Sequence, residues 1–254
     1  MLLKITEKCS MGCTHCMNSA TSNGAHMSEQ TLRDALHFLW VNRAYDHIVV
    51  SGGEPTEHPE FEHMIQVIFD FFDKKDIYGM ITITTNGFWC LDNIESAKRI
   101  ARGTGRMQVL WQVSTDDRYY PKLLPTSKRL WREDGFVLCE RCVAQIYPQG
   151  NALKNEIPWK AKASKCFNVR AMVKQMPLPT IGLLVEGMLS RGYFCTPAIR
   201  IDGKISLGES DLCPKVASIY DPEELIIEKI KNFQCSQCDF INDSLPYLYR
   251  KFVM

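Results

Sequence analysis

Three cysteines near the N-terminus constrain this chain more than any other feature. Cys9, Cys13 and Cys16 form the pattern C-x3-C-x2-C, directly after a short apolar run at residues 2–5. Cysteine thiolates are the usual ligands of iron–sulfur clusters. A four-iron cluster needs four ligands and this loop supplies three, so one iron would stay open for catalysis. A zinc loop or three buried thiols are the alternatives, but zinc sites favour paired C-x2-C over this asymmetric triplet.

A second group of cysteines lies near the C-terminus. Gly203 lies in the sequence Ile-Asp-Gly-Lys-Ile, which predicts a hairpin turn. The turn would bring together the first two of four cysteines that make a complete ligand set for a further cluster: Cys195, Cys213, Cys235 and Cys238. A structural zinc site with the same ligands is the alternative.

Four other cysteines have no assigned role. Cys139 and Cys142 form another C-x2-C pair, which is either a further metal site or two ordinary thiols. Cys90 and Cys166 stand alone in the sequence. We interpret Cys90 as a buried core thiol, because free cysteine behaves as a small apolar residue.

The first half of the chain alternates β-like and helical patterns. We expect strands at residues 2–5, 47–50, 80–85 and 107–115, and helices at residues 28–42, 59–73 and 91–102. Ser28 is the expected cap of the first helix, and a further strand is expected within residues 136–147. This order predicts an α/β fold with a parallel sheet and right-handed crossovers. A partial barrel fits, because catalytic groups collect at the carboxyl ends of barrel strands.

Several polar or glycine-rich segments follow the expected strands. Gly52-Gly53-Glu54-Pro55 comes after the second strand, where residues without Cβ would let the backbone approach a ligand. Asn86 lies in a Thr-Asn-Gly turn after the third strand. Ser114 and Asp116 lie at the end of the fourth strand, where they could equally cap a helix.

Together, the cysteine triplet and the Gly-Gly-Glu-Pro segment resemble the radical S-adenosylmethionine (radical SAM) superfamily. The resemblance implies that Cys9, Cys13 and Cys16 bind a [4Fe–4S] cluster whose open iron chelates SAM. It also implies a set of SAM-contacting residues at the strand ends: Gly52, Gly53, Glu54, Pro55, Asn86, Ser114 and Asp116.

The C-terminal cysteines resemble the Twitch domain, a truncated SPASM domain that holds one auxiliary [4Fe–4S] cluster. This resemblance implies a shortened, TIM-like (β/α) barrel at residues 1–190 with a small cysteine-rich extension at residues 191–254. The ligands of the auxiliary cluster would be Cys195, Cys213, Cys235 and Cys238.

Composition narrows the partners and the setting of the protein. No apolar run is long enough for a membrane span, and no signal-like segment precedes Cys9, so we expect a cytoplasmic, anaerobic protein. Residues 118–176 hold 12 Lys or Arg against 4 Asp or Glu, a net charge of +8 (12 − 4). Such a basic stretch favours an anionic substrate. Nothing in the sequence specifically signals nucleic acid binding.

These patterns predict a radical SAM oxidoreductase. A 5′-deoxyadenosyl radical would abstract hydrogen from a small, possibly anionic molecule, and the auxiliary cluster would assist the oxidation. A reductant such as flavodoxin or ferredoxin is the expected protein partner. The alternatives are a peptide-modifying maturase, a glycyl-radical activase, or a zinc-binding interaction protein without enzymatic activity.

Overall fold

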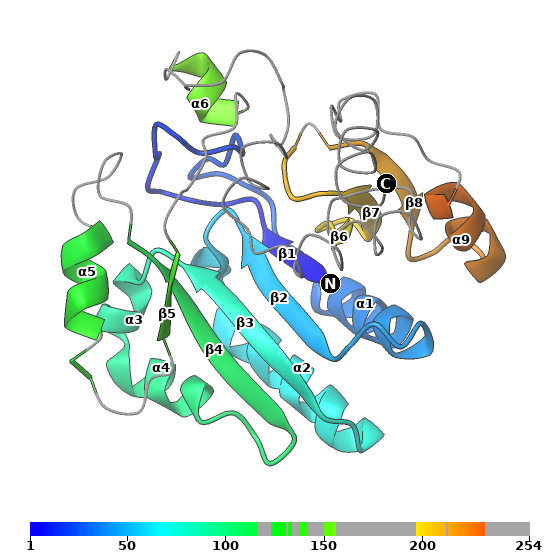
Figure 1. Ribbon diagram of the computed structural model, residues 1–254, viewed down its shortest axis with the longest axis horizontal. Coiled ribbons are helices and arrows are strands. Elements are labelled where there is room, and N and C mark those ends of the chain that lie inside the picture. The colour runs from blue at the N-terminus through cyan, green and yellow to red at the C-terminus, as the bar shows by residue number, and fades with distance from the viewer. Residues whose placement is uncertain are drawn as a thin grey trace, which may run out of the picture.

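One mixed sheet organises the part of the chain that the structure describes. The computed structural model describes residues 1–115, 123–130, 132–133, 138–141, 150–155, 197–211 and 213–231. Within these residues, eight strands follow the order β5-β4-β3-β2-β1-β6-β7-β8 (Figure 1). The strands are β1 (Leu2–Thr6), β2 (His47–Gly52), β3 (Gly79–Thr85), β4 (Met107–Ser114), β5 (Leu138–Arg141), β6 (Pro197–Ile199), β7 (Lys204–Leu207) and β8 (Lys215–Ser218).

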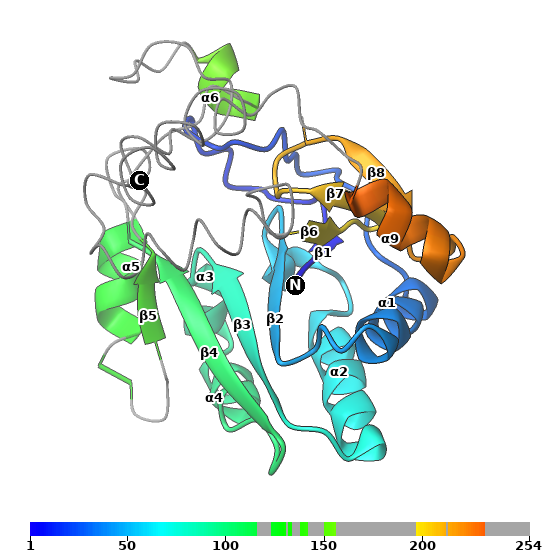
Figure 2. The ribbon, with the colours of Figure 1, turned by 45° about the vertical axis from the view of Figure 1, so that its right-hand side comes forward.

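Strands β1 to β5 pair in parallel, as the β-α-β-α pattern predicts. Leu3 pairs with Val50, and Val50 in turn pairs with Ile83, so the first three strands are closely in register. Helices α1 (Glu29–Val41) and α2 (Phe61–Lys75) lie on one face of this sheet, as Figures 1 and 2 show. The prediction of an α/β fold like the partial barrel of radical SAM enzymes is confirmed.

The two long helices form where the apolar spacing predicts them. The side chain of Ser28 accepts a hydrogen bond from the Thr31 N–H and so caps α1, as expected. Helix α2 ends at Asp76, whose left-handed backbone (φ 58°) closes the last turn. Both helices bury their apolar stripes against the sheet.

The single helix predicted at residues 91–102 is wrong in its extent. The structure has two short helices instead, α3 (Phe88–Asp92) and α4 (Ile94–Ala101), which meet at Asn93. Asn93 has a non-helical backbone (φ −128°, ψ 49°), and its side chain donates to the Trp89 carbonyl at 3.1 Å. Asparagine breaks the helix here because its amide competes for nearby backbone groups.

The two faces of the sheet differ in chemistry. Leu3, Ile5, Val50, Ile81 and Ile83 belong to the apolar core on the helical face. Because side chains alternate along a strand, their neighbours point to the opposite face. These neighbours are buried but polar: Lys4, Thr6, Ser51, Thr82 and Thr84. The face of the sheet opposite the helices, which we call the inner face, is therefore polar next to the strand ends.

The described C-terminal strands extend the same sheet beyond β1. Strand β6 pairs in parallel with β1, and β6 and β7 form the predicted hairpin around Gly203 (φ 76°). Helix α9 (Glu223–Lys231) follows β8. It begins at Glu223, directly after Pro222. Before it, the Asp221 carboxylate accepts hydrogen bonds from the Ser218 N–H and from Lys229. The division of the chain at residue 190 stays a prediction.

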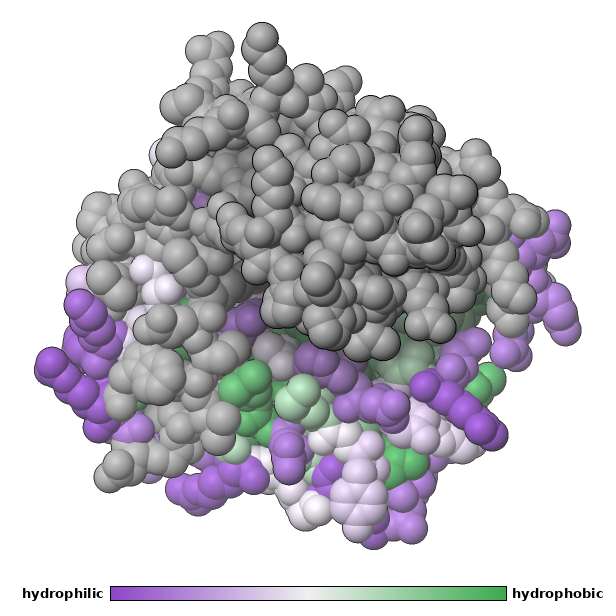
Figure 3. All heavy atoms as spheres, in the orientation of Figure 1, coloured by the Kyte–Doolittle hydropathy of each residue, from purple (hydrophilic) through white to green (hydrophobic). Residues whose placement is uncertain are grey.

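Surface chemistry adds one observation. In Figure 3 the visible described surface carries many hydrophilic residues with smaller hydrophobic areas between them. Among the helices that the structure describes, none combines the length and the apolar character that a membrane crossing needs.

Candidate functional site

The loop that follows β1 carries all three N-terminal cysteines. We call residues 7–26 the cysteine loop; its two ends are joined where the Glu7 N–H donates to the Ala25 carbonyl at 2.8 Å. Within it, the Cys9 N–H donates to the Thr21 carbonyl at 2.9 Å and the Cys16 N–H to the Cys13 carbonyl at 3.2 Å. The cysteines are partly buried and lie beyond the carboxyl end of β1.

Two other elements hold the cysteine loop from outside. The carboxylate of Glu57, in the short helix η1 (Pro55–Glu57), accepts from the Ser10 N–H at 2.8 Å and from the Ser10 hydroxyl at 2.7 Å. Helix α6 (Gly150–Lys154) contacts the other side of the loop, above the sheet in Figure 1. There the Asn151 amide donates to the Cys13 carbonyl at 3.4 Å, and the Ala152 N–H donates to the Cys16 carbonyl at 3.2 Å.

The sequence did not indicate either of these contacts. Glu57 is one of many acidic residues in its region, and Asn151 of helix α6 lies 138 residues from the cysteine that it contacts. The one available signal is Gly150 (φ 54°), where an added Cβ would lie 2.6 Å from the Met17 carbonyl group. Gly150 is therefore the point at which α6 packs closely on the cysteine loop.

Burial favours the protonated form of all three thiols of the cysteine loop. Burial raises the pKa of Cys9 to about 12 and that of Cys13 to about 11, and it also raises the pKa of Cys16. The charge of Cys13 also raises the pKa of Cys9, and that of Cys16 raises the pKa of Cys13, so Cys13 lies near both other thiols. Thiols of this kind become ligands when a metal replaces their protons.

The donor set suits an iron–sulfur cluster, although it is not preassembled. In the residues described, no three His, Cys, Asp or Glu side chains already stand in a metal-binding arrangement. The three thiols nevertheless share one short loop, within eight residues of the sequence. Three sulfur donors of this loop fit three irons of a cube and leave the fourth iron open.

Gly52 and Gly53 are required by the packing of the chain itself. An added Cβ would lie 2.5 Å from the Thr6 carbonyl oxygen at Gly52, and 2.2 Å from the Lys8 carbonyl oxygen at Gly53. The Gly53 and Glu54 N–H groups donate to these same carbonyls at 2.8 and 2.7 Å. The end of β2 thus lies directly against the start of the cysteine loop. Their approach to a ligand stays a prediction.

Glu54 braces the ends of β2 and β3 from a buried position. Its carboxylate accepts from the Thr56 hydroxyl (2.7 Å), the Thr85 hydroxyl (2.7 Å) and the Asn86 N–H (2.8 Å). Burial raises the pKa of Glu54, while these hydrogen bonds act in the opposite direction and favour the carboxylate. The side chain is only 4% exposed, so it shapes the site from beneath.

The remaining predicted residues divide into those that the structure describes and those outside it. Ser114 ends β4 and is half-buried, and the Pro55 ring is buried in η1. Cys90 is fully buried in the core, as interpreted from the sequence. Cys213 is partly buried in the turn before β8. The following lie outside the described residues: Asp116, Cys142, Cys166, Cys195, Cys235 and Cys238.

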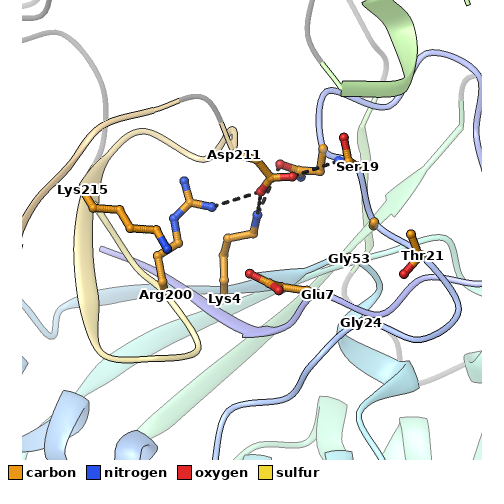
Figure 4. Close-up of a pocket in the computed structure, with 11 residues that line it drawn as sticks. Lys4, Glu7, Ser19, Thr21, Gly24, Gly53, Arg200, Asp211 and Lys215 are labelled. Carbon is orange, nitrogen blue, oxygen red and sulfur yellow. Dashed lines mark hydrogen bonds and ion pairs between the residues drawn. The ribbon is translucent and has the colours of Figure 1, made fainter. Parts of the chain in front are cut away.

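A cavity of about 230 Å³ lies where the cysteine loop meets the C-terminal hairpin. Figure 4 shows Lys4, Arg200 and Asp211 on one side of it, with Ser19 and Thr21 on the loop side. Glu7 and Lys215 also line the cavity, so it is strongly polar. It joins β1, the cysteine loop and the residues after β7 in one place.

Comparisons with known proteins agree with this geometry. The family model of the radical SAM superfamily matches residues 3–132, which include the cysteine loop and the ends of β1 to β4. The chain therefore belongs to the radical SAM superfamily, whose members use a [4Fe–4S] cluster and SAM. A search of curated proteins found no match.

A solved structure supports the same fold. The crystal structure of BtrN in complex with AdoMet and 2-DOIA superposes with a TM-score of 0.53 at 12% identity, covering 99% of this chain and 85% of BtrN. Streptococcus suis SuiB bound to S-adenosylmethionine gives a TM-score of 0.48 at 13% identity, covering 92% of this chain and 68% of SuiB. At these identities the likeness concerns the fold alone.

Proposed function

We propose that this radical SAM enzyme oxidises a small polar molecule, with Cys9, Cys13 and Cys16 as the ligands of its SAM-binding cluster. The observation that carries the proposal is the cysteine loop itself, which carries three thiols beyond the ends of parallel strands and whose first residues lie against Gly53. When bound, the cluster supplies the electron that cleaves SAM to a 5′-deoxyadenosyl radical, which abstracts hydrogen from the substrate.

The chain's own residues hold and shape this site. Glu57 and helix α6 hold the loop backbone on two sides, so the three thiols start from a fixed frame. Glu54 fixes the turn at Asn86 relative to the Gly-Gly segment. We assign Gly52–Pro55, Asn86, Ser114 and Asp116 to SAM binding. Rigid positioning of this kind is how a protein brings reactants together in productive geometry.

The inner face of the sheet favours a polar substrate. Lys4, Ser51, Thr82 and Thr84 point away from the helices and are buried, so this side of the sheet is polar rather than apolar. The basic segment at residues 118–176 adds positive charge to the same chain. BtrN was crystallised with 2-DOIA, and a small ligand is our proposal for this chain too. A peptide substrate is the alternative outcome of the assay below.

We further propose that Cys195, Cys213, Cys235 and Cys238 bind an auxiliary [4Fe–4S] cluster. Cys213 lies two residues beyond Asp211, which contacts the cysteine loop, and this proximity supports a role for the second set near the first. The auxiliary cluster would accept the electron that the substrate radical loses, while a proton leaves to solvent. Abstraction of one hydrogen atom followed by loss of one electron and one proton is a two-electron oxidation.

Iron counting after anaerobic reconstitution tests both cluster assignments. We expect about eight irons per chain in the wild type and about four when Cys9, Cys13 and Cys16 are all changed to Ala. The matched control is Cys90→Ala. Because the Cys90 thiol is buried in the core, this variant should keep the full iron content. About four irons falling to none, with zinc retained, would refute the auxiliary cluster.

The activity assay uses the same proteins. Dithionite-reduced enzyme with SAM should release 5′-deoxyadenosine, and the triple variant should release none above background. Adding candidate polar small molecules or short peptides should raise this release only for the correct class. Release unchanged by removal of the three cysteines would refute the site assignment.

A further inference from the structure

The Asp211 carboxylate joins three segments that are distant in the sequence. Its Oδ2 accepts a hydrogen bond from the Ser19 N–H in the cysteine loop at 2.9 Å, across 192 residues. Its Oδ1 lies 3.3 Å from Lys4 Nζ in β1 and 3.5 Å from Arg200 Nη1 after β6. Figure 4 shows this carboxylate between the two cations and the loop.

Both cations at this carboxylate are buried and firmly held. The Lys4 side chain is 2% exposed and also donates to the Asn18 side chain and to the Glu209 carbonyl, each at 3.2 Å. The Arg200 side chain is 4% exposed and donates to the Ser206 hydroxyl at 2.7 Å and to the Gly208 carbonyl at 3.2 Å. Buried charges are tolerated when they are paired and hydrogen-bonded, so these contacts fix where the carboxylate lies.

A second contact points the same way. The Ser51 hydroxyl at the end of β2 donates to the Glu209 carboxylate at 3.0 Å. The residues after β7 therefore reach across β1 to β2 and contact the base of the cysteine loop. Ser19 lies three residues beyond Cys16, and Asp211 lies two residues before Cys213.

We infer that Asp211 is a positioning residue, which couples the order of the cysteine loop to the C-terminal hairpin through the Ser19 N–H. The inference rests on the proposed function for the role of the loop in cluster binding. Asp211 acts on the loop through the backbone N–H of Ser19 rather than as a cluster ligand. Its removal should loosen the loop and alter the cluster that the loop holds.

The test compares Asp211→Asn with a matched variant on the same hairpin. An amide has one acceptor oxygen, so Asn can serve either the Ser19 N–H or the cations, not both. Asp202→Asn is the control, because Asp202 accepts from the Lys204 N–H and pairs with Lys204 and Lys215 within the C-terminal strands. Both variants lose one negative charge from the same segment.

Hydrogen exchange of the reconstituted enzyme, followed by mass spectrometry, gives the first readout. Loss of a hydrogen bond to a charged group should speed exchange in residues 9–24 roughly tenfold or more in Asp211→Asn, and Asp202→Asn should leave it unchanged. The second readout is the EPR spectrum of the reduced cluster with SAM, which should change only in Asp211→Asn. Faster exchange confined to residues 197–211, with unaltered EPR spectra, would overturn the inference.

A second variant covers the case in which Asp211→Asn does not fold because Lys4 and Arg200 lose their counterion. Lys4→Met together with Asp211→Ala removes one buried charge along with the carboxylate, and it still removes the acceptor of the Ser19 N–H. Its loop should exchange as fast as that of Asp211→Asn, whereas wild-type exchange would refute the inference. An iron count of about four in the wild type would count against the auxiliary cluster alone, because the exchange measurement follows the cysteine loop.

Discussion

Replacing Gly53 by alanine should break the contact between β2 and the cysteine loop. The added Cβ would lie 2.2 Å from the Lys8 carbonyl oxygen and 2.6 Å from the Lys8 carbonyl carbon. Both are backbone atoms, so no flexible side chain can move aside. The two segments must separate by about 1 Å before the contact reaches an ordinary van der Waals distance.

That separation carries an energetic cost that the structure allows us to estimate. Overpacking a well-packed site costs about 1–3 kcal/mol. The hydrogen bond from the Glu54 N–H to the Lys8 carbonyl, now 2.7 Å, would lengthen at the same time, and a hydrogen bond contributes about 1 kcal/mol. We expect Gly53→Ala to lower the free energy of unfolding by about 2–4 kcal/mol. Because Lys8 precedes Cys9, iron content should fall as well.

Urea unfolding followed by circular dichroism measures the first effect, and iron content after reconstitution measures the second. The matched control is Gly105→Ala, because no heavy atom lies within 4 Å of the Cβ that it would add. The control should unfold at the wild-type urea concentration and keep its iron. Gly53→Ala with wild-type stability and full iron content would refute the packing argument.

Three further changes have defined outcomes. Glu54→Gln should lower the free energy of unfolding by about 1–3 kcal/mol in urea titrations, because an amide N–H₂ must face one of the donors that the carboxylate now accepts; equal urea midpoints would contradict this. Glu57→Ala should speed hydrogen exchange at Ser10 but change the free energy of unfolding in urea titrations by no more than about 0.5 kcal/mol, because the contact is exposed. Asp221→Asn should be less stable than wild type at neutral pH, because the hydrogen bond from Lys229 lowers the pKa of Asp221. A carboxyl pKa that folding lowers stabilises the fold fully above the unfolded-state pKa of about 4, and this contribution is lost as the pH falls through the lower pKa of the folded state. The difference should therefore shrink steadily below about pH 4; a difference that stays constant down to acid unfolding would exclude the ion pair as its cause.

The sequence predicted those parts of the fold that local patterns determine. Period-3.6 apolar spacing and the Ser28 cap located α1, and the order of strands and helices predicted the parallel sheet. The break at Asn93 was missed because a single asparagine inside an apolar helical pattern is usually tolerated. The hairpin around Gly203 was predicted from its turn residues. Its attachment beside β1 was not, because pairing between distant strands leaves no local signal.

The candidate site was likewise predicted from the sequence only where its residues lie close together along the chain. Cysteine spacing identified the loop because all its proposed ligands lie within eight residues. Glu57, Asn151 and Asp211 hold that loop from 47, 138 and 192 residues away from their partners. Each is an ordinary polar residue in its own segment, so only the folded chain shows what it contacts.

The cysteine loop is short of regular structure, yet its backbone is held at several places. Glu57 binds it near Cys9, helix α6 binds it at Cys13 and Cys16, and Asp211 binds it just beyond Cys16. Each contact goes to the loop backbone, except for the added bond at the Ser10 hydroxyl. These contacts hold the loop backbone in place beside its three cysteines. Gly53 contributes to the same support of the loop. Because it has no side chain, the chain just after β2 lies directly against Lys8, the residue before Cys9.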